Sequence, residues 1–443
     1  MGKDDKTNYP FTEALHKFLI EINGLSDSLP IIMKSLYDAR HETNQNIEKF
    51  VQDNKGVIEK IEDNKHRKVF IYGVKAENVY GFETLLRQNT NFSAASSITP
   101  RGFLVTIVSQ FDAFMGRLIK AMYYTKPDML NSSAKSFTFA NLIELGSMEA
   151  ARDYILEKEV ESVLRESHAE HFEWLEKKLE ITLRNRDLDI WSDFIELTER
   201  RNLFVHTDGE VSSQYISVCE KNGVSIEKDC IVGKKLGVTQ EYFQRACEIL
   251  FELATKLTHT VWRKLNISEL SEADKSLNAV CYDLLKEEKY ELAKKILSFA
   301  LAQKKHNSQM DKLIFTINIA IAYKWGGEAE KAVKIVSETD WSACDNSFKL
   351  ASTVLLDNFD EAANIMRKIG VGEEVGKVEY KEWPVFKDFR QSTQFLEAYK
   401  EVFGEFLEPI DITDEPTSLD QEESNFFSSD GTNQQSVIET SAV

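Results

Sequence analysis

An arginine and a histidine five residues apart, Arg201 and His206, are the side chains of this chain whose types and spacing point most directly to chemistry. A fixed guanidinium neutralises charge that builds on a phosphate, while an imidazole moves a proton near neutral pH. Together they could cleave a phosphodiester. Arg201 continues the apolar line of Ile190, Phe194 and Leu197, where burial of a guanidinium requires an anionic partner. The spacing alone recurs by chance, so the surrounding elements must support the interpretation.

The segment DLDIWSDFIELTERRNLFVHTDG, residues 187–209, predicts the helix that positions both side chains. Asp187 or Asp189 can cap its N-terminus, and Gly209 can follow its last turn. His206 then lies in the last turn, where the negative end of the helix dipole favours the protonated imidazole.

Other helices are expected on both sides of this one. From Arg101, the segment GFLVTIVSQFDAFMGRLIKAMYY is apolar on most faces, which predicts a central buried helix that stops near Pro127. Helical periodicity continues across 138–183, and a helix from Thr239 to Leu265 follows.

The N-terminal part predicts long helices over residues 12–68. One apolar stripe, either a short coiled coil or an ordinary surface helix, consists of Ile47, Phe50, Val51, Val57, Ile58 and Ile61. Residues Val69–Gly73 form a brief strand or the end of that helix. The polar stretch Asn89–Pro100 predicts a boundary.

Three segments after residue 270 share an Ala followed three residues later by Ile: YELAKKI at Ala293, EKAVKI at Ala332 and DEAANI at Ala362. Each follows an apolar helical stretch, and a small Ala lets two helices approach closely. The pattern resembles a degenerate tetratricopeptide-type solenoid. A plain helical bundle is the alternative.

Composition favours an internal, soluble, mainly helical protein of two or three domains. Few Pro and Gly argue against a sandwich or barrel, and five cysteines without a CxxC pair indicate reduced thiols. The N-terminus lacks an apolar signal segment, and no apolar run approaches membrane-spanning length. The net charge of −19 argues against general nucleic-acid affinity. Residues 401–443, however, hold eleven acidic and no basic residues, which leaves −8 on the remainder and permits a local basic cleft.

Other chemistries have weaker signals. The chain has no GxxxxGK[ST], GxGxxG, HExxH or GxSxG motif, so ATPase, dehydrogenase, zinc protease and α/β-hydrolase activities are not indicated. His168, Glu170 and His171 could place metal ligands on one helical face, but a solvated helix is favoured because no further donor is evident nearby. We therefore expect neither a metal nor a cofactor.

The segment ERRNLFVHTDGEVSSQY resembles the signature helix of the HEPN domain (higher eukaryotes and prokaryotes nucleotide-binding), which carries Arg, often a polar residue, and then His. The helix LVTIVSQFDAFMGRLI similarly resembles the leading helix of that family, with Asp112 where an acidic residue often sits. The likeness covers about residues 96–265. A subset of the family has Tyr two residues after the His; Asp208 stands there instead, so the nucleotidyltransferase control of that subset is not implied.

This resemblance implies a helical bundle that dimerises so that two motifs face each other, and metal-independent RNA cleavage that leaves a 2′,3′-cyclic phosphate. It assigns His206 as the acid–base residue, Arg201 as the phosphate ligand and Asn202 as an orienting residue. The candidates for steering RNA are Arg184, Arg186 and Arg200. Such proteins often serve as toxins or anti-phage effectors.

The prediction is thus an all-α cytoplasmic protein that does not span a membrane. It has a helical extension over 1–95, a HEPN-like domain over 96–268, helical repeats over 269–404 that could bind a protein partner, and a disordered acidic tail over 405–443. The alternative is a non-catalytic helical adaptor.

Overall fold

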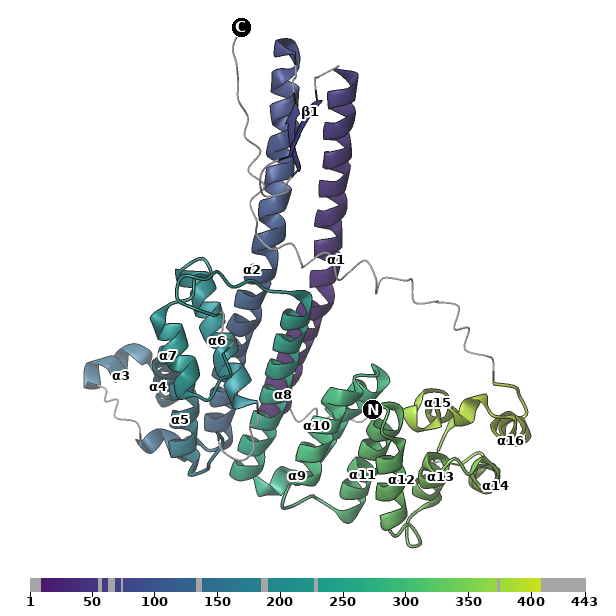
Figure 1. Ribbon diagram of the computed structural model, residues 1–443. Helices are drawn as coiled ribbons and strands as arrows, with labels where there is room; N and C mark the ends of the chain where they lie inside the picture. The colour runs from purple at the N-terminus through teal and green to yellow at the C-terminus, as the bar shows by residue number, and fades with distance from the viewer. Residues whose placement is uncertain are drawn as a thin grey trace. The chain divides into compact units, whose positions relative to one another are not determined.

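The computed structural model describes residues 9–54, 58–62, 68–72, 75–132, 138–184, 190–226, 230–372 and 375–407. Helices make up most of these residues, so the chain is all-α, as predicted (Figure 1). The long helices at the start are α1 (Pro10–Asp53) and α2 (Val79–Thr125). Short 3-10 helices lie at Ala76–Asn78, Pro127–Ser132, Ile267–Glu269, Pro384–Phe386 and Phe389–Gln391.

The chain forms two compact units from interleaved segments. The first comprises the described residues within Met1–Phe18, Phe111–Trp191 and Glu248–Glu415, and the second those within Leu19–Gln110 and Ser192–Cys247. These units do not coincide with the four consecutive ranges predicted from sequence, because α1, α2 and α8 (Gln240–Leu265) each contribute residues to both.

In the second unit, α1 and α2 run alongside each other in opposite directions (Figure 1). Ile47 and Val51 of α1 pack on Phe82 of α2, and the rings of Phe50 and Phe82 stack with centroids 6.2 Å apart. A Cβ on Gly81 would lie 3.2 Å from the Phe50 ring, so glycine permits this close approach. Ile47, Phe50 and Val51 of the predicted stripe therefore lie on the contact face of a helical hairpin. Ile58 and Ile61 lie in a strand instead, and Val57 lies outside the described residues.

Two expectations about residues 54–100 are wrong. Beyond Asp53, helix gives way to β1 (Ile58–Glu62), which pairs antiparallel with β2 (Lys68–Tyr72), so the 12–68 helix prediction fails after α1. The β-branched and aromatic run in β2 favours a strand. The predicted boundary at Asn89–Pro100 is also absent, since α2 runs through it with Pro100 buried inside the helix. The stretch is helical although its side chains before Pro100 are partly or fully exposed.

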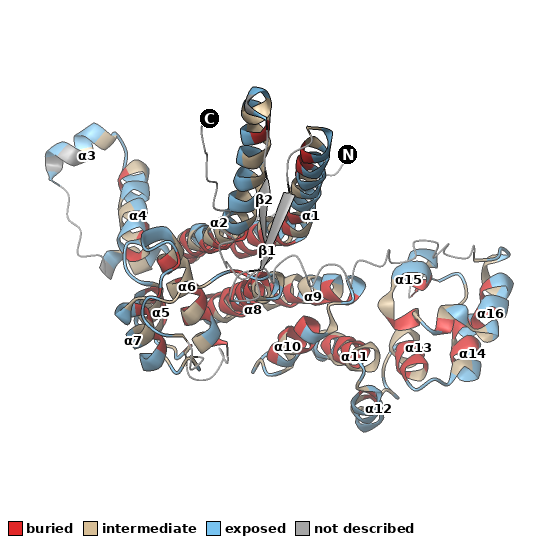
Figure 2. Cartoon of the chain, turned by 45° about the horizontal axis from the view of Figure 1, so that its top comes forward, coloured by how far each residue is buried: buried red, intermediate tan, exposed pale blue. Residues whose placement is uncertain are grey.

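The apolar second half of α2 is buried, as predicted (Figure 2). Its fully buried side chains are Leu104, Ile107, Val108, Phe111, Phe114, Met115, Leu118, Ile119 and Met122. By length and composition α2 is the one helix in the described residues that could cross a membrane, which corrects the expectation that no run approaches that length. Half of its most apolar window is buried inside the protein.

In the first unit, α2 is followed by α3 (Phe139–Leu145), α4 (Met148–Leu164) and α5 (His168–Leu179), which confirms the periodicity predicted for 138–183. Ser147 caps α4 by accepting a hydrogen bond from the Ala150 amide. Ser167 and Glu170 form a reciprocal capping box at the start of α5.

The C-terminal part of the first unit is a succession of helices: α9 (Leu270–Lys286), α10 (Tyr290–Leu301), α11 (Gln309–Trp325), α12 (Ala329–Glu338), α13 (Asn346–Leu355), α14 (Phe359–Ile369), α15 (Lys377–Glu382) and α16 (Thr393–Phe403). The three predicted Ala residues, Ala293, Ala332 and Ala362, lie on α10, α12 and α14 and are completely buried. The tetratricopeptide likeness itself stays a prediction.

The turn before each of these helices has the same geometry. Glu288, Gly327 and Asp357, each five residues before the Ala, have left-handed φ angles of 56°, 83° and 59°. The next residue in each turn donates its amide to a carbonyl five residues earlier, at 2.9, 2.8 and 3.1 Å. The three helices therefore begin after the same type of turn, a common way for a helix to end, which is also formed at Glu180 and Gly223.

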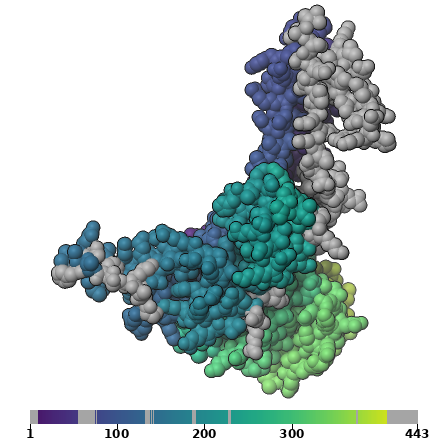
Figure 3. Space-filling view, turned by 60° about the vertical axis from the view of Figure 1, so that its left-hand side comes forward, coloured from purple at the N-terminus to yellow at the C-terminus, as the bar shows by residue number. Residues whose placement is uncertain are grey.

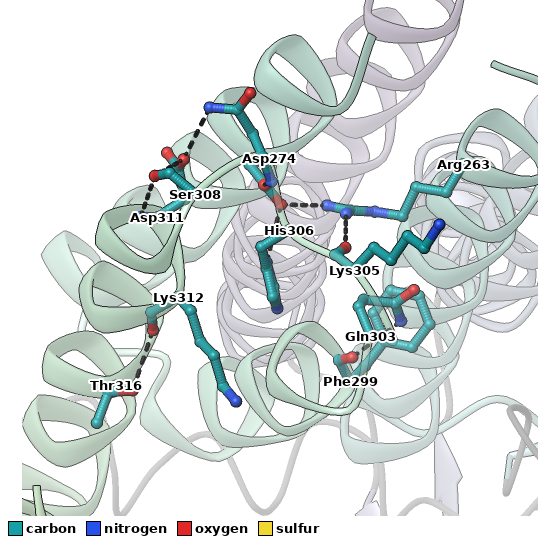
Figure 4. Close-up of polar contacts among 11 residues, drawn as sticks. Arg263, Asp274, Phe299, Gln303, Lys305, His306, Ser308, Asp311, Lys312 and Thr316 are labelled. Atoms are coloured by element: carbon teal, nitrogen blue, oxygen red, sulfur yellow. Dashed lines mark hydrogen bonds and ion pairs between the residues drawn. The ribbon is translucent and has the colours of Figure 1, made fainter. Parts of the chain in front are cut away.

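Buried polar side chains line one face of α8 within the first unit: Glu252, Lys256, His259 and Arg263. The last of these, Arg263, donates to Asp274 of α9 at 2.6 Å and to the Lys305 carbonyl at 3.2 Å (Figure 4). Asp274 also contacts His306 Nδ1 at 3.1 Å and accepts a hydrogen bond from the Asn307 amide at 2.7 Å. This cluster joins α8 and α9 to the α10–α11 connection.

His259 makes stability depend on pH. Its ring is completely buried beside Trp262, and within the described residues neither ring nitrogen has a hydrogen-bond partner. Burial, reinforced by Arg263, lowers the pKa of His259 to about 3. The unfolded state, with a pKa of about 6.5, binds the proton first, so the free energy of unfolding falls as pH drops from about 6.5 towards about 3.

We expect His259→Phe to lose less stability than the wild type between about pH 6.5 and pH 4.5, with a difference on the order of 2 kcal/mol, since one pH unit corresponds to at most about 1.4 kcal/mol. Urea denaturation at the two pH values measures it. His41→Phe, at an exposed position of α1, is the control. Equal losses of unfolding free energy in the wild type and in His259→Phe would show that His259 does not cause the loss of stability at low pH.

The predicted acidic tail, 405–443, lies outside the described residues from residue 408 onward. At its start, Glu405 pairs with Lys377 at 2.9 Å, and Lys400 lies 4.2 Å from the centre of the Phe406 ring.

Candidate functional site

The helix α6 (Trp191–His206) carries the predicted Arg–Asn–His motif. Phe194 and Leu197 are buried as expected, and Arg201, further along the same line, is half-buried. The helix ends at His206, as predicted, while the proposed capping residues Asp187 and Asp189 lie outside the described residues. In the space-filling view, the segment that contains α6 and α7 (Ser213–Lys221) forms part of the visible surface (Figure 3).

Arg201 is held by its neighbours on α6. Its Nη1 donates to Asn202 Oδ1 at 3.1 Å, and Asn202 Nδ2 donates to Glu199 Oε1 at 3.3 Å. Arg201 Nε is buried and has no hydrogen-bond partner within the described residues. The guanidinium is therefore oriented by an amide, and no ion pair within the described residues neutralises it, so it can bind an anion.

His206, the last residue of α6, is exposed. Within the described ranges no hydrogen bond or ion pair engages its imidazole, so the ring is accessible to a substrate. Five residues along an α-helix separate two Cα positions by about 7.5 Å of rise and about 140° of rotation. Arg201 and His206 of one chain are therefore not placed on one face by their spacing.

The backbone after His206 turns sharply. Asp208 and Gly209 both have left-handed φ angles, 52° and 82°, and the Gly209 amide donates to the Leu203 carbonyl at 3.0 Å. A Cβ on Gly209 would lie 2.9 Å from the Phe204 ring and 3.0 Å from the Leu236 carbonyl. The turn thus requires glycine at this position, in agreement with the predicted helix stop.

Arg200 points into a separate polar cluster. Its Nε donates to Glu196 Oε1 at 2.7 Å, and its guanidinium lies 4.0 Å from the centre of the Tyr242 ring. Tyr215 and Tyr242 donate to the two oxygens of Glu196 at 2.7 and 2.6 Å. Burial opposes the charge of Arg200, but Tyr242 and Glu196 outweigh it and raise its pKa. Because its charge is compensated, the contacts of Arg200 do not support the predicted role in RNA steering.

The structure does not place the other two residues predicted to steer RNA, Arg184 and Arg186, at the end of α6. Arg184 belongs to the first compact unit, where its Nε and Nη2 bind Glu176 Oε2 at 2.9 and 2.6 Å. Arg186 lies outside the described residues. Both remain predictions.

The three residues of the metal-ligand alternative on α5 have different surroundings. His168 Nε2 contacts Asp112 Oδ1 at 2.8 Å, which places the acidic residue of the predicted leading helix in the first unit. Glu170 completes the capping box, and Ser167 lowers its pKa. His171 is buried, and burial lowers its pKa to about 4. Across the described ranges, no group of three or more His, Cys, Asp or Glu side chains could hold a metal ion.

Sequence reasoning missed the cations at the turn after His206. Arg101 of α2 and Lys235 both bind Asp208, at 3.1 and 2.6 Å. Lys235 reaches it because Glu210 and Lys235 form an isolated antiparallel bridge. The Asp208-Gly209 and Gly233-Lys234-Lys235 runs were visible as turn signals, but their pairing is a tertiary contact that no local pattern indicates.

Comparison of the chain with protein-family models, curated proteins and solved structures found no match. The HEPN likeness of α6 therefore rests on the residues of the motif alone and stays a prediction.

Proposed function

We propose that the chain is a metal-independent endoribonuclease and that the C-terminal end of α6 is its active site. The observation that carries the proposal is an oriented guanidinium, Arg201, on the same helix as an exposed imidazole, His206, that has no partner within the described residues. A cation without a bound carboxylate favours an anionic ligand, and an accessible imidazole can transfer protons near neutral pH.

The proposed chemistry uses the ribose 2′-hydroxyl as the nucleophile. His206 takes the proton of this hydroxyl as its oxygen bonds to phosphorus, and the bond from phosphorus to the 5′-oxygen breaks. The 5′-oxygen leaves and takes up a proton from water, which gives a 2′,3′-cyclic phosphate and a 5′-hydroxyl, and His206 returns its proton to the solvent. Arg201, oriented by Asn202, stabilises the negative charge on the phosphoryl oxygens.

A homodimer fits this chemistry. Because five helical residues separate Arg201 and His206 by about 140°, a symmetric pair of α6 ends could place the arginine of one protomer near the histidine of the other. By the HEPN resemblance, the protein would act in the cytoplasm on cellular RNA, as a toxin or an anti-phage effector.

An adaptor function is the second candidate, favoured by one observation. The equivalent turns before α10, α12 and α14 support a helical repeat, and repeats offer extended surfaces for protein partners. In the ribonuclease proposal, the same region would bind a regulatory partner.

The test uses the purified wild-type chain and an end-labelled RNA, with EDTA in the buffer. Cleavage should persist in EDTA, and the products should resist ligation until the cyclic phosphate is opened. RNA methylated at every 2′-oxygen is the matched control and should stay intact, because its nucleophile is blocked. Cleavage that requires added Mg²⁺, or that also cuts the methylated RNA, would refute the mechanism.

A further inference from the structure

Three segments of the second compact unit meet at the carboxylate of Asp208. Arg101 Nη1, from α2, lies 3.1 Å from Oδ1 and 3.4 Å from the Asp208 carbonyl oxygen. Lys235 Nζ lies 2.6 Å from Oδ2. The Arg101 guanidinium also lies 5.6 Å from the centre of the Phe204 ring, on the last turn of α6. Two cationic side chains from distant parts of the chain thus bind one carboxylate.

The residues next to Lys235 also form backbone hydrogen bonds with the residues that follow Asp208. The Leu236 amide donates to the Gly209 carbonyl at 2.9 Å, and the Val211 amide donates to the Lys234 carbonyl at 2.9 Å. Asp208 itself has a φ of 52°, a conformation that Asp and Asn tolerate better than most residues. These contacts determine the direction in which the chain leaves α6, directly after His206.

We infer that Asp208, clamped by Arg101 and Lys235, is a positioning residue for His206; this inference rests on the proposed function. The imidazole of His206 has no partner of its own within the described residues, so its location depends on the backbone at the helix end. The Asp208 side chain is 71% exposed, and exposed ion pairs contribute little to stability. The clamp therefore restricts the motion of the end of α6 and adds little to the stability of the folded protein.

The variants for the test are Asp208→Asn, Lys235→Met and the double variant. Asn keeps the left-handed backbone preference but removes the charge. We expect Asp208→Asn to lower kcat between about 10- and 100-fold with little change in KM, because small displacements of a catalytic group are costly. Lys235→Met leaves the Arg101 bond and should lower kcat by less, and the double variant should be no worse than Asp208→Asn, since that substitution already removes the charge that both cations bind.

A second readout does not depend on catalysis. Hydrogen–deuterium exchange of the peptide that spans residues 203–211 should be faster in Asp208→Asn than in the wild type, while exchange in α8 should be unchanged. Unchanged exchange at 203–211 would overturn the clamp whether or not RNA is cleaved.

The kinetic outcomes separate the two proposals. A wild-type chain that does not cleave RNA contradicts the proposed function, and faster exchange in the variant would then leave the clamp as a feature of the helix end alone. If the wild type cleaves RNA but Asp208→Asn retains its kcat, the positioning role is wrong. An increase in KM at constant kcat for Lys235→Met would make Lys235 a direct RNA contact instead.

Discussion

Replacing His206 by alanine is expected to slow RNA cleavage by at least about 100-fold, the smaller end of the range for removal of a general acid–base group. The imidazole is the proton-transfer group in the proposed step. Because it is exposed and makes no hydrogen bond or ion pair within the described residues, its loss should leave the fold intact, with a change in stability within about 0.5 kcal/mol. Initial rates on a labelled RNA, together with circular dichroism, measure both quantities.

A matched control is available on α1. His41 is exposed in the same compact unit, where its ring contacts Gln45 at 2.8 Å. His41→Ala should cleave RNA at the wild-type rate. A parallel loss in both histidine variants would point to a general effect of the substitutions rather than to proton transfer at the end of α6.

Asp274→Ala is expected to destabilise the first compact unit by about 3–5 kcal/mol, the usual cost of removing one partner from a buried ion pair. Asp274 is 1% exposed, and the Arg263 side chain that binds it is 8% exposed. Alanine would leave the guanidinium buried without a carboxylate and would also remove the acceptor of His306 and of the Asn307 amide. Urea denaturation measures the loss.

Asp283→Ala is the control for this effect, since Asp283 lies exposed on the same helix α9. Its denaturation midpoint should stay close to that of the wild type. A midpoint shift for Asp274→Ala no larger than that for Asp283→Ala would mean that the cluster in Figure 4 contributes little to stability.

The helices were predictable where apolar periodicity and local capping agree. The buried half of α2, the bounds of α8 and the end of α6 near Gly209 follow from patterns within one segment. The failures lie where composition does not indicate the backbone conformation. The stretch Asn89–Pro100 has the composition of a break, yet it is helical in α2.

In the candidate site, too, some features follow from one segment of sequence and others only from contacts in the fold. Arg201, Asn202 and His206 lie within six residues of one helix, so their types and spacing could be read directly. The neutralisation of Arg200 by Glu196, and of Arg184 by Glu176, depends on which side chains meet in the fold. The approach of Arg101 and Lys235 to Asp208 spans more than 100 residues of sequence in the case of Arg101, and a single sequence carries no signal for such a pair.

The most direct test of the ribonuclease proposal is a time course of RNA cleavage by the wild type and His206→Ala, purified identically and assayed side by side in EDTA. The proposal predicts that the wild type accumulates product with a 2′,3′-cyclic phosphate end and that His206→Ala yields none above the buffer blank. Equal rates for the two proteins would contradict it, because the activity would then come from another site or another protein.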